Sequence, residues 1–162
     1  MIEKIKQQIS ASIAVKESMF HYCIEDIQSA ASLMIDSIRK GGKIFWCGNG
    51  GSAADAQHLA TELMGGMTSH DRKPIPSIAL TTDSSFITAW SNDTGFESIF
   101  SRQIQGLGNA GDVLIGISTS GNSENVLAAV KQAKFKELST IVFTGNSGGK
   151  INGVPDISIN IP

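Results

Sequence analysis

Five short apolar runs, separated by stretches with helical spacing, restrict the fold of this chain more than any other feature. The runs lie at residues 43–47, 77–80, 113–117, 140–143 and 157–161. Apolar residues between them recur with helical spacing over 53–66, 96–107 and 124–135. Strands that alternate with helices form a parallel sheet, and runs without polar alternation fit strands covered on both faces. We therefore predict an α/β fold with a doubly wound, five-stranded parallel sheet.

The first 40 residues have helical spacing throughout. Isoleucines recur there at three- and four-residue steps, at Ile2, Ile5, Ile9 and Ile13. A second apolar stripe covers 24–38, and the glycine pair at 41–42 ends it as a C-cap would. A chain of 162 residues has the size of one domain. We predict a single domain over 1–162, with N-terminal helices over 1–40 and an α/β core over 43–162.

Charge and hydropathy argue against two classes of partner. The net charge is -2 and the pI is about 5.9, whereas a nucleic-acid surface needs a basic excess. No apolar run reaches the ~18 residues that a membrane span needs, and the N-terminus lacks the apolar stretch of a signal peptide. The two cysteines, Cys23 and Cys47, lack metal-ligand spacing, so we expect a protein of the reducing cytoplasm.

Charged residues are scarce, at 17% of the chain against about 25% in an average domain. A chain this short has a large surface to solvate. The low charge therefore indicates that a partner covers part of the surface, and we expect an oligomer.

A glycine-rich loop follows the first predicted strand. It contains Asn49, Gly50, Gly51 and Ser52, and Ser52 with Asp55 has the spacing of a capping box. Glycines let backbone amides face a ligand, and the N-terminus of the following helix favours an anion. A tight strand-to-helix turn without a ligand is the alternative. A dinucleotide site is disfavoured, because the first acidic residue after the second strand comes much later than the ~20 residues expected.

A hydroxyl-rich loop follows the third predicted strand. It contains Ser118, Thr119, Ser120 and Ser123, which together can bind a phosphate without cationic side chains. The alternative is a polar loop in which Ser123 or Asn122 caps the next helix. In the flavodoxin-like strand order 2-1-3-4-5, strands 1 and 3 are neighbours, and ligands bind at their carboxyl ends. A sugar phosphate lying there would contact both loops.

Two other pairs carry candidate chemistry. His58 and Glu62 lie four residues apart on one helix face, where they could bind a divalent metal or transfer protons. An exposed helix face without function is the alternative, and further ligands such as His21 or His70 would be needed for a metal. Asn92 and Asp93 could bind sugar hydroxyls from a polar turn, or could serve only as a turn and cap.

These residues resemble the sugar isomerase (SIS) family, and most closely its phosphoheptose isomerases. The resemblance spans almost the whole chain and rests on the stretches Cys47–His58, Asn92–Arg102 and Gly111–Ser123, with a late glycine turn at Gly145–Gly149. It implies isomerisation of sedoheptulose 7-phosphate to D-glycero-D-manno-heptose 7-phosphate, for lipopolysaccharide or other surface sugars. It also implies a cytoplasmic homotetramer that contains Zn²⁺.

The resemblance assigns roles to the matching residues. Substrate contacts would come from Asn49, Gly50, Gly51, Ser52, Glu62, Asn92, Asp93, Ser118, Thr119, Ser120 and Ser123. His58 and Glu62 would bind zinc, and Glu62 would also be the catalytic base that moves a proton between two carbons.

Two departures from the family pattern, and two rival functions, accompany this resemblance. Relatives typically carry an arginine shortly after the Glu-Leu pair, where this chain has Gly65-Gly66. They also continue past the fifth strand into a helix that supplies further zinc ligands and the general acid, so we expect the chain to Pro162 to be a poor isomerase by itself.

Some SIS proteins are instead non-catalytic tetramers that bind a bacterial replication initiator, or modules that sense sugar phosphates. His58 and Glu62 favour the isomerase, because a binding module does not need that pair.

Overall fold

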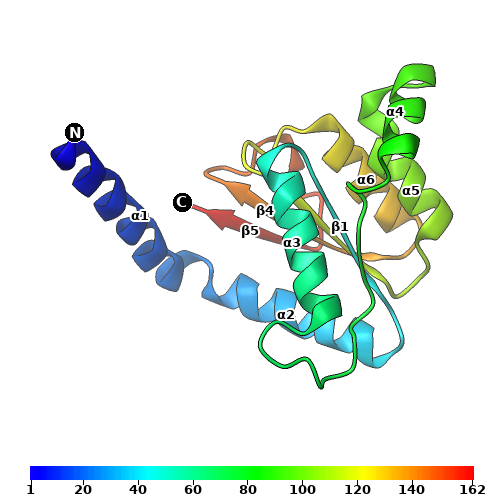
Figure 1. The fold of residues 1–162 in the computed structure, drawn as a ribbon, viewed down its shortest axis with the longest axis horizontal. Helices are drawn as coiled ribbons and strands as arrows, with labels where there is room; N and C mark the ends of the chain where they lie inside the picture. The colour runs from blue at the N-terminus through cyan, green and yellow to red at the C-terminus, as the bar shows by residue number, and fades with distance from the viewer.

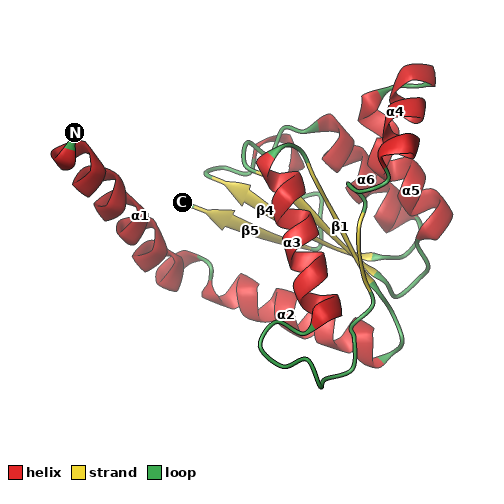
Figure 2. Ribbon diagram, viewed as in Figure 1, coloured by secondary structure: helices red, strands yellow, loops and turns green.

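A computed structural model describes residues 1–162 and shows one parallel sheet with helices on both faces (Figures 1 and 2). Its strands are β1 (Ile44–Gly48), β2 (Ser77–Ala79), β3 (Val113–Ser118), β4 (Ser139–Gly145) and β5 (Ile157–Ile161). All neighbouring strands pair in parallel, in the order β2-β1-β3-β4-β5. The predicted fold class and strand order are confirmed.

The helices account for most of the remaining chain. They are α1 (Ile2–Tyr22), α2 (Ile24–Arg39), α3 (Gly51–Gly65), α4 (Ser84–Asp93), α5 (Ile99–Leu107) and α6 (Glu124–Phe135), with short 3₁₀ turns η1 (Phe96–Ser98) and η2 (Gly149–Ile151). Helix α4 was not predicted, because its Ser, Asn and Asp residues are typical of turns. Asp83 starts the helix by accepting a hydrogen bond from the Phe86 N–H at 2.9 Å.

The sheet separates two apolar cores. Alternate residues of β1 and β3 face opposite sides, as the period of a strand requires. Phe45 and Leu114 pack with α5 and α6 in one core, and Trp46 and Ile115 pack with α2 and α3 in the other. The two helices that follow β1 and β3 along the chain, α3 and α6, therefore lie on opposite faces of the sheet.

A partly buried ion pair joins the segments that lead into β1 and β3 at their amino ends. Asp112, which is 3% exposed, accepts hydrogen bonds from the Lys43 backbone N–H at 2.9 Å and from Lys43 Nζ at 2.7 Å. The ladder then runs in register from Ile44 opposite Val113 to Gly48 opposite Ile117. The loops that follow β1 and β3 consequently begin side by side at the same edge of the sheet.

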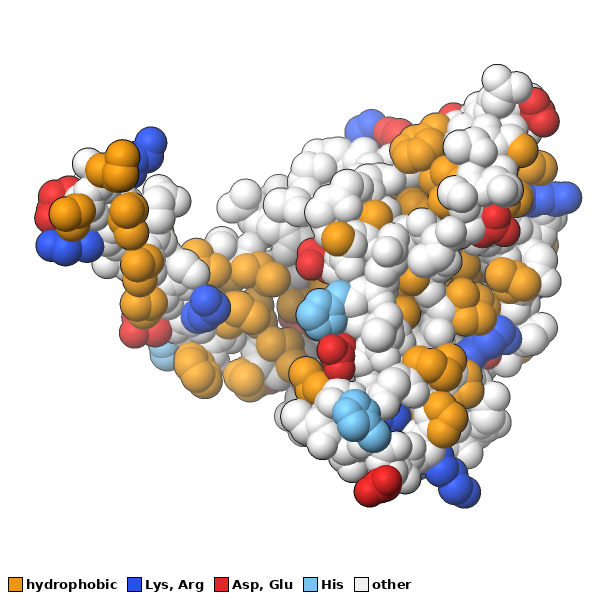
Figure 3. All heavy atoms as spheres, in the orientation of Figure 1, with side chains coloured by type: hydrophobic (Ala, Val, Ile, Leu, Met, Phe, Trp, Pro, Cys, Tyr) orange, Lys and Arg blue, Asp and Glu red, His pale blue; other side chains and the backbone are white.

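Helix α1 extends away from the rest of the molecule (Figure 1). None of its residues is buried, and apolar side chains form a row along it (Figure 3). An isolated helix of this kind is marginal in water, because helices gain most of their stability from packing an apolar face. No helix of the protein has the length and apolar character that crossing a membrane requires.

The C-terminal end of α3 is built around a glycine. Gly66 has a φ of 103°, and a Cβ there would lie 2.5 Å from the Ser69 carbonyl oxygen. Arg72 from the following loop donates hydrogen bonds to the carbonyls of Glu62 and Leu63 at 2.7 and 2.6 Å. An arginine is therefore present at this helix end, although it does not follow the Glu-Leu pair directly.

Candidate active site

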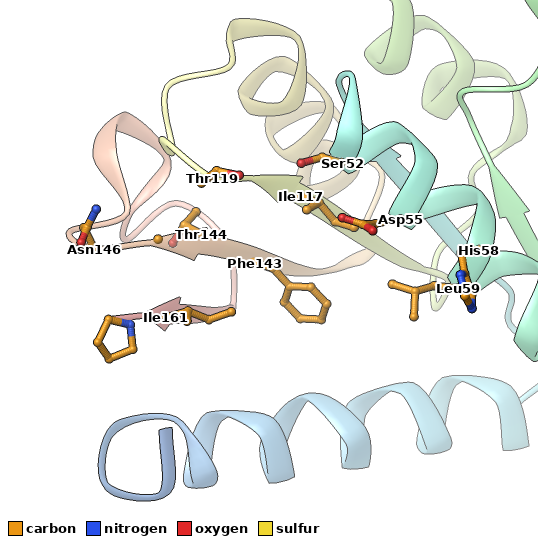
Figure 4. Close-up of a pocket in the computed structure, with 12 residues that line it drawn as sticks. Ser52, Asp55, His58, Leu59, Ile117, Thr119, Phe143, Thr144, Asn146 and Ile161 are labelled. Carbon is orange, nitrogen blue, oxygen red and sulfur yellow. The ribbon is translucent and has the colours of Figure 1, made fainter. Parts of the chain in front are cut away.

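A cavity of about 670 Å³ opens between α3 and the carboxyl ends of β3 and β4 (Figure 4). Its floor is apolar and consists mainly of Leu59, Ile117, Phe143 and Ile161. Its polar rim comes from α3 and from the strand ends and consists of Ser52, Asp55, His58, Thr119, Thr144 and Asn146. An apolar floor with a rim of polar groups is typical of a small-molecule site.

Helix α3 supplies one polar wall of this cavity. Ser52, Asp55 and His58 recur at three-residue steps and so share one helix face. The predicted capping box is wrong, since the helix begins at Gly51 with Gly50 as its N-cap and no side chain caps it. Ser52 and Asp55 lie inside the helix. Both side chains line the cavity, and neither forms a hydrogen bond that caps the helix N-terminus.

His58 and Glu62 lie together on α3 as their spacing predicts. His58 Nε2 is 3.3 Å from Glu62 Oε1, and the two side chains are 70% and 33% exposed. His58 lines the cavity, whereas Glu62 lies one turn further along the helix and outside the cavity lining. The pair is open to solvent and accessible to a ligand.

The donor types of this pair fit zinc, but the pair is not a complete site. Zinc in proteins has at least three protein ligands, and no group of three His, Cys, Asp or Glu side chains with metal-binding geometry occurs in the structure. His70 Nδ1 lies 3.2 Å from the Gly65 carbonyl oxygen, and His21 lies on α1. Cys47 is fully buried in the core on the α5–α6 face of the sheet, opposite to α3, and this burial raises the pKa of its thiol to about 12.

The hydroxyl-rich loop connects β3 to α6. Ser118 is buried and donates a hydrogen bond to Ser123 Oγ at 3.0 Å, while Thr119 and Ser120 are exposed. Ser123 occupies the N-cap position of α6 but makes no side-chain cap. The backbone N–H groups of Ser120 and Ser123 have no acceptor within the chain. Free amides and hydroxyls at the start of a helix form an anion-binding arrangement.

The turn at 145–151 holds this loop in place. Gly145 N–H donates to the Thr119 carbonyl at 2.9 Å, and Ile151 N–H donates to the Gly121 carbonyl at 3.0 Å. Gly121 has a φ of 65°, and a Cβ there would overlap the backbone of Gly148. The loop and the turn thus pack backbone against backbone, which only glycine permits.

An ion pair lies beside the same loop. Lys150 Nζ donates to Glu124 Oε1 at 2.6 Å, at the first turn of α6. This hydrogen bond from Lys150 and its positive charge lower the pKa of the Glu124 carboxyl. The ammonium also offsets the negative charge that Glu124 would otherwise present to an anion in the loop.

The glycine-rich loop joins β1 to α3. The N–H groups of Gly50 and Gly51 have no acceptor within the chain. Asn49 exchanges two hydrogen bonds with Asn125: Asn49 Nδ2 donates to Asn125 Oδ1 at 2.8 Å, and Asn125 Nδ2 donates to Asn49 Oδ1 at 2.9 Å. The second hydrogen on Asn49 Nδ2 has no acceptor within the chain, so the loop can still offer donors to a ligand.

Asn92 and Asp93 lie apart from the cavity. They occupy the last turn of α4 and not the predicted turn, they are exposed, and Asn92 Nδ2 donates to Asp93 Oδ1 at 2.9 Å. Neither residue lines the cavity. Within one chain, the structure does not bring them to the other predicted site residues.

Sequence reasoning missed three polar side chains of the cavity. Asp55 was considered only as a cap, although its three-residue step from Ser52 and His58 places it on their helix face. Thr144 and Asn146 follow β4, whose carboxyl end lies at the same edge of the sheet as those of β1 and β3. The position of β4 beside β3 was the signal that could have identified them.

Comparison with known proteins identifies the family. The family model for the SIS domain matches residues 8–145. The phosphoheptose isomerase of Neisseria meningitidis serogroup A is 46% identical over 99% of this chain and 82% of its own length. The phosphoheptose isomerase of Aquifex aeolicus is 45% identical over 100% of this chain and 84% of its own length.

Solved structures agree with the sequence matches. A phosphoheptose isomerase from Neisseria gonorrhoeae superimposes with a TM-score of 0.92 at 45% identity, over 99% of this chain and 86% of the other. One from Francisella tularensis gives a TM-score of 0.94 at 39% identity, over 99% of this chain and 85% of the other. The chain therefore belongs to the phosphoheptose isomerases, enzymes of the SIS-domain family.

Proposed function

We propose that the protein isomerises sedoheptulose 7-phosphate to D-glycero-D-manno-heptose 7-phosphate through an enediolate, for lipopolysaccharide or other surface-sugar synthesis. One observation carries this proposal: a single cavity is lined at its strand ends by Thr119 of the hydroxyl-rich loop and on α3 by His58. Thr119 supports a phosphate at the strand ends, and His58 supports a sugar that extends toward the His58–Glu62 pair, with Glu62 one helical turn beyond the cavity lining. The names of the relatives support a heptose phosphate as that ligand.

The phosphate belongs at the Ser118–Ser123 loop. Thr119 and Ser120 present exposed hydroxyls, and the N–H groups of Ser120 and Ser123 are free to donate. Hydrogen bonds to a charged group are stronger than those to a neutral one, so this end fixes the substrate. The sugar then extends along α3 toward His58.

Glu62 is the group we assign to carbon proton transfer. Its carboxylate would take a proton from C1 of the ketose, leaving an enediolate, and return it to C2 to give the aldose. The proton on O1 moves to O2 in the same conversion, which needs a second acid–base group besides Glu62. Zinc, when bound, would polarise the two substrate oxygens and stabilise the enediolate.

We further propose that His58 and Glu62 provide two of the zinc ligands. Replacing His58 with Ala should remove most of the zinc from the complete gene product, since one of few ligands is lost. Metal analysis by mass spectrometry measures this. A His70→Ala variant is the control and should keep its zinc, because His70 contacts the Gly65 carbonyl. Full zinc in the His58→Ala protein would place the metal elsewhere.

A homotetramer is the assembly we propose. Helix α1 has no buried residue and carries exposed isoleucines at 2, 5, 9 and 13, so a monomer would leave this apolar surface in water. Light scattering should therefore show a particle of several chains at micromolar concentration. A particle of 17.1 kDa would contradict the proposal for these residues. Replacing Ile5 and Ile9 together by Ser should shift the assembly toward smaller species.

One assay separates the isomerase from its two rivals. The complete gene product, incubated with sedoheptulose 7-phosphate in D₂O, should form the aldose with deuterium incorporated at C2, as NMR would show. Deuterium enters because the carboxyl proton exchanges with solvent during the enediolate stage. A protein that binds the sugar phosphate without turnover would instead be a sensing module. One that neither binds nor converts it would leave the non-catalytic partner-binding function.

A further inference from the structure

We propose that Asn125 is a positioning residue that fixes the distance between the two substrate-binding loops. The proposal rests on the proposed function, which places the phosphate at the Ser118–Ser123 loop, and it adds that the glycine-rich loop contacts the sugar. Asn125 belongs to neither loop: it is the second residue of α6, and only 3% of it is exposed. Its side chain forms the reciprocal amide pair with Asn49 described above.

This pair is the only hydrogen-bonded link between the glycine-rich loop and the segment made of the hydroxyl-rich loop and the start of α6. No other hydrogen bond joins residues 49–52 to residues 119–125. The link also spans the sheet, because Asn49 leads into α3 on one face and Asn125 begins α6 on the other. Each helix carries its own loop, so the amide pair couples two elements that otherwise meet only through β1 and β3.

The chemistry of the pair makes it geometrically strict. Each amide donates one hydrogen bond and accepts one, so both side chains are fixed in plane and in separation. Asn125 Oδ1 also accepts the Val126 N–H at 3.0 Å, which orients it against its own helix. Helix α6 is in turn seated on β3, since a Cβ on Gly116 would lie 2.7 Å from Val126 Cγ1. Asn125 therefore fixes the position of Asn49, and with it the free amides of Gly50 and Gly51, relative to α6.

Loss of the Asn49–Asn125 pair should affect the sugar phosphate and free phosphate differently. A ligand that contacts both loops needs their separation to be correct, whereas a ligand held by the Ser118–Ser123 loop alone does not. Loss of the amide pair should weaken binding of the sugar phosphate and leave binding of free phosphate unchanged. A residue that merely supports the fold would weaken both.

Calorimetry with two probes tests this on the complete gene product. Asn125→Leu keeps the volume of the side chain and removes both hydrogen bonds. We expect it to weaken sedoheptulose 7-phosphate binding by about tenfold or more, and inorganic phosphate binding by less than about twofold. Asn152→Ala is the control: Asn152 is exposed and its side chain makes no hydrogen bond, so both affinities should stay at the wild-type values.

A double-mutant cycle adds a second readout. If the pair acts as a unit, Asn49→Ala combined with Asn125→Leu should weaken heptulose phosphate binding no more than the stronger single change. Should Asn125→Leu not fold, Asn125→Ser replaces it, since its hydroxyl can still accept the Val126 N–H. Unchanged heptulose phosphate binding, or an equal loss for both probes, would overturn the proposal. Wild-type protein that binds the heptulose phosphate without converting it would refute the isomerase function and leave this test valid.

Discussion

Replacing Glu62 with Gln should lower kcat for the isomerisation by about 10²- to 10⁴-fold, the contribution of a general base. Glutamine keeps the size of the side chain and its place beside His58, but it cannot accept the C1 proton. Incorporation of deuterium at C2 should fall by the same factor, because both depend on that proton transfer. The measurement is turnover of sedoheptulose 7-phosphate followed by NMR.

Two controls separate the base from other roles of Glu62. The zinc content of the Glu62→Gln protein is measured first, because loss of the metal would also lower turnover. Turnover of the variant and of the wild type is then compared at full zinc occupancy. Glu137→Gln makes the same chemical change at an exposed residue just before β4. Glu137 lies at the amino ends of the strands, away from the cavity, so this variant should retain wild-type turnover. A Glu62→Gln enzyme within about threefold of the wild type would assign the proton transfer to another group.

Replacing Ser118, Thr119 and Ser120 together with Ala should weaken sugar phosphate binding by well over tenfold, since each lost hydrogen bond to a charged group costs about 1.5–3 kcal/mol. The effect should be smaller than the sum of three such bonds. Ser118 is buried and donates to Ser123, so part of its role is to hold the loop, and the free backbone amides remain. Calorimetry with sedoheptulose 7-phosphate measures the loss.

The matched controls for this variant use both ligand and protein. Sedoheptulose without its phosphate should bind the triple variant and the wild type equally. Ser147→Ala removes an exposed hydroxyl from the neighbouring turn and should leave the affinity for the sugar phosphate unchanged. An unchanged affinity of the triple variant would exclude this loop as the phosphate site.

The fold was accessible from the sequence because its signals are local. The apolar runs at 113–117 and 157–161 became β3 and β5 with bounds that match closely, and the predicted helix over 124–135 is α6. Helix α4 was missed because the polar residues at 91–93 are typical of a turn, whereas the cap at Asp83 starts the helix. The predicted capping box was wrong for a related reason: Gly50 is the N-cap of α3, so Ser52 lies inside the helix.

The site was less accessible, because it depends on distances between distant residues. Spacing alone placed His58 and Glu62 on one face, and the structure gives 3.3 Å between their polar atoms. The partnership of Asn49 with Asn125, 76 positions apart in the chain, follows only from the three-dimensional arrangement of the helices. Asn92 and Asp93 matched the family motif, yet α4 carries them away from the cavity.

The backbone contact between Gly121 and Gly148 bears on the rate and the entropic cost of binding at the proposed phosphate site. The two segments touch backbone to backbone and share two hydrogen bonds, so we expect the Ser118–Ser123 loop to have the same shape before and after a ligand binds. The ordering entropy is then lost during folding and not during association. At the proposed phosphate site, we therefore expect capture without a conformational step, at a rate set by diffusion and orientation of the ligand.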